Sequence, residues 1–301
     1  MVVIEPDTDA VNVPAIVESG RICAVAVQAY RELMEWTAQY KNVFSGGPFD
    51  SSLFNAVCLC TAFSAPWAKS AELRMANRSA VWGFVPDWLI DYVATSRSEV
   101  DDVVGRCLAV ADGDQPAADD DLARSLADIR DELATSRAFP PLRDAWVDDL
   151  RRYLLGMARE WDWKEARTSG VTDGPTFAEY LQNADNFGFS FPFVSHWIYT
   201  TPLPVTNIEA IRQASWATQR AMRLVNDLGT YQRDLKWGDL NGLMLGITPE
   251  EMHTHIAELT AQFRDIARPL RADHPRLISY LERQRDFCIG FYQAADYWGA
   301  I

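Results

Sequence analysis

Apolar side chains in this sequence recur at every third or fourth position over almost its whole length, and few stretches alternate as a half-buried strand would. This spacing places the apolar residues on one face of a helix, so the pattern predicts an all-α fold. No internal repeat divides the chain into smaller units. We expect helices at about 13–40, 52–75, 80–92, 99–112, 118–135, 142–163, 177–187, 207–235, 249–270 and 275–298.

Length and composition favour one folding unit. The chain has 301 residues, of which 48% are hydrophobic and 12% aromatic, and can therefore bury a large core. No shift in composition marks a second domain. We expect a single α-domain over residues 13–301, with residues 1–12 as a flexible N-terminal tail.

The charge balance excludes several classes of partner. The formal net charge is −14, whereas a nucleic-acid-binding domain carries a basic stripe and a membrane anchor a basic cluster. No apolar run reaches the roughly 18 residues that span a bilayer, and the first ten residues lack the basic start of an export signal. Five cysteines without the paired spacing of a zinc site indicate reduced, buried thiols. We expect a cytoplasmic protein that binds neither nucleic acid nor membrane.

The segment 223–241, RLVNDLGTYQRDLKWGDLN, contains the first candidate site. Asn226, Thr230 and Asp234 stand four residues apart, which on a helix brings an amide, a hydroxyl and a carboxylate to one face. Mg²⁺ prefers such oxygen ligands and usually shares its shell with a phosphate. The segment therefore predicts a magnesium site that serves a diphosphate substrate.

A second candidate site is a pair of acids in the segment 81–93, VWGFVPDWLIDYV. Asp87 and Asp91 lie one helical turn apart and can bridge magnesium ions. Their neighbours are apolar and aromatic, where acids without partners would be costly, so the pair is expected to bind a cation. The acid pairs at 101–102 and 148–149 have more polar neighbours and are interpreted as surface acids. The acidic run at 119–121 begins a predicted helix, where negative charge favours the helix dipole.

The two candidate sites resemble the metal-binding motifs of class I terpene synthases. The second motif of that family has an Asn or Asp, a Ser or Thr four residues later, and a Glu or Asp eight residues later, as Asn226, Thr230 and Asp234 do. The pair Asp87 and Asp91 stands where the family has its aspartate-rich motif. The resemblance covers about residues 80–300 and implies a helical bundle with a central apolar cavity.

A third segment narrows the resemblance. The sequence EYLQNA at 179–184, followed by Gly188, Ser190 and Pro192, is similar to the stretch that lines the cavity beneath the carbocation in labdane-related diterpene synthases. We therefore identify the chain as resembling the bacterial labdane-related diterpene synthases of the kaurene synthase type.

Three departures from the family pattern are informative. The aspartate-rich motif usually has two adjacent acids, but here Trp88 occupies the second position. Ala184 stands where many bacterial relatives have a diphosphate-sensing arginine, and the C-terminal Arg-Tyr pair is replaced by Asp296-Tyr297. Contacts to the diphosphate must then come from other basic residues. The candidates flank the motif helix: Arg223, Arg233 and Lys236.

The family chemistry also predicts a dry, aromatic cavity. Aromatic faces stabilise a cation by about 0.5–2 kcal/mol each. Gly188 is expected at a helix break caused by Pro192, whose missing N–H leaves carbonyls unpaired, and Ala184 lies one turn earlier. His196 is interpreted as structural. The expected cavity residues are Phe84, Trp88, Ala184, Phe187, Gly188, Phe191, Trp197, Tyr231 and Trp298.

The resemblance implies a reaction as well as a fold. A cluster of three Mg²⁺ ions would bind a labdane diphosphate of the copalyl type, and the ionised substrate would cyclise to a polycyclic diterpene. The sequence has no DxDD motif, so an upstream class II diterpene cyclase would have to supply the bicyclic substrate. Relatives are usually dimers, so a homodimer is also implied.

Other functions remain open at this point. A synthase that uses linear geranylgeranyl or farnesyl diphosphate directly could carry the same metal motif, and only the segment 179–184 disfavours it. Chain-elongating prenyltransferases share the fold but have a second aspartate-rich motif where this chain has NDLGT at 226–230. A non-catalytic carrier of hydrophobic ligands would explain the amphipathic helices but not the polar ligands beside Arg223 and Lys236.

Overall fold

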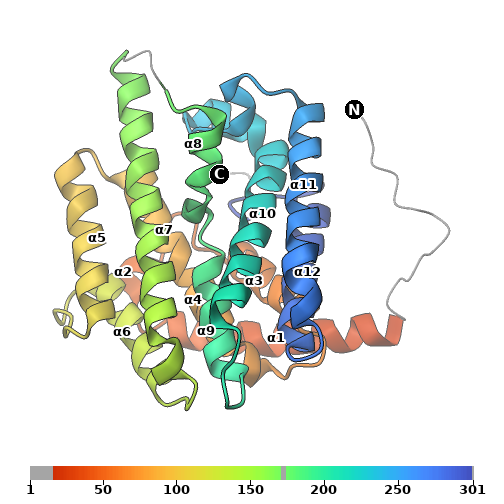
Figure 1. Ribbon diagram of the computed structural model, residues 1–301. Coiled ribbons are helices and arrows are strands. Elements are labelled where there is room, and N and C mark those ends of the chain that lie inside the picture. The colour runs from red at the N-terminus through yellow and green to blue at the C-terminus, as the bar shows by residue number, and fades with distance from the viewer. Residues whose placement is uncertain (1–15, 171–173, 300–301) are drawn as a thin grey trace.

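The computed structural model describes residues 16–170 and 174–299, and helices are the regular elements of this part of the chain (Figure 1). The expected all-α fold is therefore confirmed. The predicted tail at 1–12 lies outside the described residues. The elements in chain order are α1 (Ile16–Thr37), α2 (Lys41–Phe44), α3 (Ser51–Ser64), α4 (Ser70–Trp88), η1 (Leu89–Val93), α5 (Arg97–Asp112), α6 (Asp121–Ala134), α7 (Phe139–Thr168), α8 (Phe177–Gln182), η2 (Ala184–Phe187), α9 (Ser190–Thr200), α10 (Ile208–Trp237), η3 (Gly242–Leu245), α11 (Pro249–Ala267), η4 (Arg268–Leu270) and α12 (Pro275–Tyr292).

The long helices surround the centre of the molecule. Helix α10 packs against α11 and α12, α12 also packs against α3, and α4 packs against α9 and α1. In Figure 1, α10 and α11 run alongside one another, α7 runs in a similar direction, and α1 crosses one end of the bundle. No helix of the described residues is both long and apolar enough to cross a bilayer.

Several helices begin and end where the sequence provides a cap. The carboxylate of Asp50 accepts the N–H of Leu53 at the start of α3. Helix α11 starts with a capping box, in which Thr248 and Glu251 each accept the other's backbone N–H. Helix α10 ends at Gly238, whose φ of 77° lies in the left-handed region that glycine adopts without strain. Each N-cap contributes about 1 kcal/mol and fixes where its helix starts.

Proline corrects the predicted boundaries before the aspartate pair. The chain does not form one helix at 52–75 and another at 80–92: α3 stops at Ser64, and α4 runs unbroken from Ser70 to Trp88. Pro66 lacks an N–H, and its ring pushes the preceding Ala65 out of the helical region, to φ −123° and ψ 67°. The result is that Asp87 lies at the end of a long helix.

A wider turn follows at once. The segment η1 is a π-helix, in which the N–H of Ala94 donates to the carbonyl of Leu89, five residues earlier, at 2.8 Å. Such turns are uncommon and often occur at functional sites. It carries Asp91, the second acid of the pair.

The predicted break near Pro192 is real but has a different cause. The chain turns at Gly188, whose φ of 73° is left-handed, and an added Cβ there would lie 3.0 Å from the ring of Tyr153. The following segment forms α9, which the sequence analysis did not anticipate. Pro192 is the third residue of α9, where its N–H would have no intrahelical partner, so it fits a helix start.

Candidate active site

A cavity of about 190 Å³ lies among α3, α4, α7, α10 and α12. A single buried water needs only ~10–15 Å³, so this space is large enough for an organic substrate. On α4 the lining residues recur at helical spacing from Ala76 to Asp87, a rise of about 16 Å along the axis. The polar residues of the lining include Asp87, Asp91, Glu160, Arg223, Asn226, Arg233, Asp234, Asp239, Gln284 and Asp296.

The two predicted metal motifs meet at this cavity. Asp87 and Asp91, which we call the aspartate wall, line it from α4 and η1. Asn226 and Asp234 line it from α10, and Thr230 lies between them in sequence; we call these three residues the α10 wall. Residues far apart in the chain are thereby brought to one space.

The acids of the aspartate wall have no protein partner. Among the described residues, neither the carboxylate of Asp87 nor that of Asp91 accepts a hydrogen bond or forms an ion pair. Burial and the charge of Asp239 raise the pKa of Asp87 to about 7. Burial and the neighbouring Asp87 raise the pKa of Asp91 well above its ordinary value. Two adjacent acids in this state would be stabilised by a cation.

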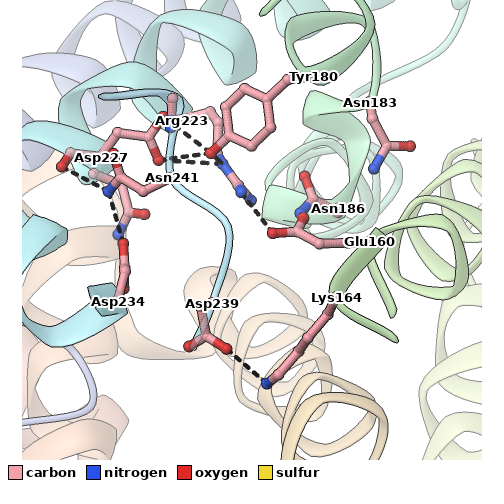
Figure 2. Close-up of polar contacts among 12 residues, drawn as sticks. Glu160, Lys164, Tyr180, Asn183, Asn186, Arg223, Asp227, Asp234, Asp239 and Asn241 are labelled. Carbon is pink, nitrogen blue, oxygen red and sulfur yellow. Dashed lines mark hydrogen bonds and ion pairs between the residues drawn. The ribbon is translucent and has the colours of Figure 1, made fainter. Parts of the chain in front are cut away.

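Two side chains of the α10 wall, those of Thr230 and Asp234, are already held in place. The hydroxyl of Thr230 donates to a carboxylate oxygen of Asp234 at 2.7 Å, and the amide of Asn241 donates to the same oxygen at 2.8 Å. Arg233 pairs with the other oxygen of Asp234 at 2.8 Å. Thr230 does not itself line the cavity, although its hydroxyl lies beside a residue that does. Figure 2 shows Asn241 reaching Asp234.

Asp227, the acid directly after Asn226, points to a different environment. Its carboxylate accepts the hydroxyl of Tyr180 at 2.8 and 3.0 Å and the N–H of Gly242 at 3.2 Å (Figure 2). Burial raises the pKa of Asp227 to about 7. It is a structural residue that ties α8 and η3 to α10.

Arg223 lines the cavity within a buried network. Its guanidinium donates to the hydroxyl of Tyr180 at 2.7 Å and pairs with Glu160 at 2.9 Å, as Figure 2 shows. Its centre also lies 4.7 Å from the centroid of the Tyr180 ring. The amide of Asn186 donates to the other oxygen of Glu160. The sequence analysis placed Arg223 correctly on the face of Asn226 but gave no sign of its partner on α7.

Of the other two predicted basic residues, one lines the cavity. Arg233 does so, and it also pairs with Asp296 in the C-terminal segment. Lys236 is exposed on α10 and does not contribute to the lining. Helix α10 ends one residue later, at Trp237, and the helical spacing carries Lys236 away from the face of Asn226.

Asp239 and Lys164 are functional candidates that the sequence analysis missed. Asp239 lines the cavity from the loop after α10, and Lys164 of α7 pairs with it at 2.8 Å (Figure 2). The hydroxyl of Tyr92 donates to the other oxygen of Asp239. Asp239 stands inside the segment quoted for the magnesium motif, but it falls off the four-residue spacing and therefore gave no periodic signal.

Only part of the expected cavity lining is found there. Phe84, Phe187, Gly188 and Trp298 line the cavity. The remaining predicted residues are placed elsewhere: Phe191 and Trp197 are buried in the core, Trp88 packs against Tyr92 and Trp298, Ala184 is buried in η2, and Tyr231 is half-buried on α10. Helix faces decide this difference, because a large aromatic on a helix next to the cavity can point into the core instead. Tyr153, Phe189, Tyr280, Tyr292 and Tyr297 line the cavity without having been predicted.

The acids outside the cavity are mostly as expected. Asp101 and Asp102 are exposed and pair with arginines on their own helix. Asp120 accepts the N–H of Ala123 and so caps α6. Asp149 was expected to be a surface acid, and this expectation is wrong because Asp149 is buried.

The burial of Asp149 has a local cause. It pairs with Arg212 at 3.1 Å and accepts the indole N–H of Trp216 at 3.0 Å. Both partners lie on α10, which packs beside α7 at this point and covers the acid. Burial raises the pKa of Asp149 to about 6.

His196 and the cysteines are structural. His196 is buried in the core, its ring stacks on Tyr280 at 4.5 Å, and burial lowers its pKa to about 4. All five cysteines are free thiols; four are buried, whereas Cys23 is exposed, which corrects the expectation that all would be buried. Cys23 lies on the outer face of α1, where Arg21 and Ala24 are exposed as well.

The residues present suit magnesium, although they do not enclose an ion by themselves. The two walls offer carboxylate, amide and hydroxyl oxygens, which are the ligands that Mg²⁺ prefers. In the described ranges, no three His, Cys, Asp or Glu side chains converge closely enough to hold an ion. Mg²⁺ commonly binds through one or two carboxylates and completes its shell with water and substrate phosphates.

Comparison with known proteins identifies this arrangement. Residues 78–265, more than half of the chain, match the model of terpene synthase family 2, C-terminal metal binding. The ent-pimara-9(11),15-diene synthase of Streptomyces sp. (strain KO-3988) is 28% identical over 283 residues, which cover 92% of this chain and 93% of that protein.

Two solved structures show the same fold at lower identity. The linalool/nerolidol synthase of Streptomyces clavuligerus in complex with 2-fluorogeranyl diphosphate has a TM-score of 0.65 and 18% identity, covering 89% of this chain and 97% of that one. The 2-methylisoborneol synthase of Streptomyces coelicolor A3(2), with Mg²⁺ and 2-fluorogeranyl diphosphate, has a TM-score of 0.67 and 18% identity, covering 92% and 93%. The chain, whose two predicted metal motifs meet at one cavity, belongs to terpene synthase family 2 and is a terpene synthase, a lyase that acts on a diphosphate.

Proposed function

We propose that the protein is a magnesium-dependent class I diterpene synthase, which ionises a labdane diphosphate of the copalyl type and cyclises the carbocation to a polycyclic diterpene. One observation carries this proposal. Asp87 and Asn226 lie on different helices but line the same cavity, and the carboxylate of Asp87 has no partner among the described residues. Asp87 is half-buried, and a partly desolvated acid without a partner is costly, so this arrangement favours a site completed by a cation.

The metal would be held by the five residues of the two walls: Asp87, Asp91, Asn226, Thr230 and Asp234. The family resemblance implies three ions. Bound Mg²⁺ would neutralise the charge that develops on the leaving diphosphate. Asp234 of the α10 wall is already fixed by Arg233 and Asn241, which lowers the entropy cost of binding.

Arg223 and Arg233 are the proposed contacts to the diphosphate. Both line the cavity, and each is oriented by an acid behind it. A guanidinium has five N–H donors, and the described hydrogen bonds of Arg223 use two of them. Donors therefore remain for phosphate oxygens, for which the planar guanidinium is well suited. Lys236, which is exposed, is left out of this proposal.

The aromatic lining would protect the carbocation. Phe84, Phe187 and Trp298 border the cavity, and an aromatic face stabilises a nearby cation by about 0.5–2 kcal/mol. The same side chains exclude water, which would otherwise end the reaction early. The helix break at Gly188 also borders the cavity, which supports a role for this turn in holding the cyclising intermediate.

Two further points favour a diterpene. The relative from Streptomyces sp. (strain KO-3988) is named for a diene, ent-pimara-9(11),15-diene. The lining of α4 continues for about 16 Å from Asp87 to Ala76, which leaves room below the metal motif for a large hydrocarbon. A class II diterpene cyclase would act upstream to supply the bicyclic diphosphate.

A linear substrate is the second candidate. The two solved structures described above contain 2-fluorogeranyl diphosphate, an analogue of a linear prenyl diphosphate. The same metal ligands would serve geranylgeranyl or farnesyl diphosphate equally well. Substrate choice then depends on the shape of the lower cavity and not on the metal motif.

One experiment separates these candidates. The purified protein is incubated with Mg²⁺ and, in separate reactions, with the copalyl diphosphate stereoisomers and the linear diphosphates, and hydrocarbons are analysed by gas chromatography and mass spectrometry. We expect product from a copalyl isomer only. Product from a linear diphosphate alone would replace the proposal with the second candidate, and product from none would argue for a hydrophobic-ligand carrier.

A further inference from the structure

The aspartate wall is one acid short of the family pattern, and the residue in that position does not replace it. Trp88 does not contribute to the cavity lining. Its ring packs on Tyr92, with centroids 5.0 Å apart, and on Trp298, at 6.1 Å. An indole has no acceptor for a hard cation, so Trp88 cannot contribute a metal ligand. Any further carboxylate on this side must come from another element.

Asp239 is placed to supply that carboxylate. It lines the cavity together with Asp87 and Asp91. The loop that carries Asp239 is anchored to α7, because the guanidinium of Arg167 donates to the backbone carbonyl of Gly238.

The contacts of Asp239 hold it beside Asp91. Lys164 pairs with one oxygen of Asp239 at 2.8 Å and also donates to the backbone carbonyl of Asp91 at 2.9 Å. Tyr92 donates its hydroxyl to the other oxygen, and the Lys164 ammonium lies 4.9 Å from the centroid of the Tyr92 ring. Figure 2 shows Lys164 reaching Asp239. Lys164 therefore fixes the position of Asp239 relative to the aspartate wall.

These contacts leave acceptor capacity on Asp239. Each carboxylate oxygen has two lone pairs, and each oxygen of Asp239 accepts one described bond. Asp87, Asp91 and Asp239 line the cavity together with Arg223 and Arg233. A divalent cation beside the three carboxylates would relieve their mutual repulsion.

We propose that Asp239 is a further metal-binding residue of this enzyme, held beside Asp91 by Lys164 and contributing a carboxylate to divalent-cation binding at the aspartate wall. The assignment rests on the proposed function only in requiring that the cavity bind divalent cations with a diphosphate. It does not depend on whether the substrate is bicyclic or linear.

The test measures Mn²⁺ binding to the full-length protein in the presence of inorganic diphosphate, by calorimetry and by the electron paramagnetic resonance of free Mn²⁺. We expect Asp239→Asn to weaken Mn²⁺ binding by at least about tenfold, the low end of the loss found when even an outer carboxylate of a metal site is removed. Asp162→Asn is the matched control. Asp162 lies on α7, as Lys164 does, and forms an exposed ion pair with Arg97 of α5. This variant should bind Mn²⁺ as the wild type does.

Lys164→Met distinguishes a metal ligand from a structural latch. If Asp239 binds the cation, Lys164→Met loosens that carboxylate but retains it, and should weaken Mn²⁺ binding less than Asp239→Asn does. If the pair only fastens the loop, Lys164→Met and Asp239→Asn should weaken binding to the same extent. That result, or unchanged binding by Asp239→Asn, would overturn the assignment.

Two checks keep the test decisive. Asp239→Glu retains the charge and should restore most of the affinity lost in Asp239→Asn. If Asp239→Asn loses its helical circular dichroism, Asp239→Ser serves as a second uncharged variant that can still accept from Lys164. If the wild type itself binds no Mn²⁺ in the presence of diphosphate, the magnesium part of the proposed function fails as well. If the wild type binds Mn²⁺ and Asp239→Asn binds it equally well, only the assignment of Asp239 fails.

Discussion

The two walls of the cavity differ in how their polar side chains are supported. On the α10 wall, Asp234 is held by Arg233, Thr230 and Asn241. On the aspartate wall, the carboxylates of Asp87 and Asp91 have no partner among the described residues. One wall is therefore built before any ligand arrives, and the other is unfavourable until a cation is present.

This difference links structure to catalysis. Hydrogen bonds and ion pairs fix the α10 wall, so little entropy is lost when it binds a ligand. The aspartate wall brings two partly desolvated carboxyl groups close together, so ionising both is costly without metal and becomes favourable when a cation binds. We expect cation binding to respond to the aspartate wall and folding stability to depend on the network behind the α10 wall.

The largest effects should be on turnover, and both walls should be needed. Asp87→Ala and Asn226→Ala should each lower the rate of diphosphate release by at least about 10³-fold, because each removes an oxygen ligand from the charge-stabilising site. The helical circular dichroism should not change. Retained activity in either variant would remove that residue from the metal site, and Asp102→Ala, which alters an exposed acid, is the control.

Substitutions in the α10 network and in the aspartate wall should change the free energy of unfolding in opposite directions. Arg223→Met leaves Glu160 and Asp227 without their buried counter-charge and should lower the free energy of unfolding by ~3–5 kcal/mol. Asp87→Asn removes a charge that has no partner and should leave the metal-free protein as stable as the wild type or more so. Urea unfolding without metal measures both. A large loss of stability in Asp87→Asn would mean that this acid has a protein partner after all.

The aspartate wall should also give the metal-free protein a pH dependence. The folded-state pKa of Asp87, about 7, lies above its ordinary value, and the pKa of Asp91 is raised as well, so the folded protein binds these protons more tightly than the unfolded chain. Their contribution to stability is present at pH below about 4 and is lost as the pH rises to about 7. The size should be of the order of 1 kcal/mol or more.

Thermal unfolding at several pH values provides the measurement. The contribution should be smaller in Asp87→Asn, and added Mg²⁺ with diphosphate should offset the loss at neutral pH. Equal pH profiles for the wild type and Asp87→Asn would contradict the prediction.

The smallest effect should come from a residue that touches neither wall. Ala184→Ser adds one hydroxyl in η2, next to the segment 186–189 that borders the cavity. We expect a change in the ratio of products with little change in the rate of diphosphate release. The hydrocarbon profile from the preferred substrate tests this, and an unchanged profile would show that η2 does not influence the cyclising intermediate.

Much of the fold follows from local sequence signals. Helical periodicity predicted most of the observed helices, and capping residues such as Thr248 explain where they begin. The errors came from proline and glycine. Pro66 ended α3 early, and Gly188 rather than Pro192 made the break before α9. A proline favours a helix start as readily as it breaks a helix, and only the surrounding turns decide which occurs.

The candidate site was predicted as far as helical spacing reaches. Asn226 and Asp234 share a face of α10 because they are eight residues apart, and this could be read directly. Glu160 and Lys164 on α7, and Asp239 in a loop, have no periodic relation to the motif. Their contacts with Arg223 and Asp91 span 63 and 73 residues of sequence. Contacts between residues so far apart in the chain leave no local pattern in a single sequence.

By itself the sequence determined an all-helical chain with two oxygen-rich motifs, because helix formation and side-chain spacing depend on residues within a few positions of one another. The tertiary structure alone decided that these motifs face one cavity, that Trp88 turns away from it, and that Arg223 and Asp239 are bound by α7. Those outcomes depend on how helices pack against one another, and packing joins residues whose separation along the chain leaves no local trace.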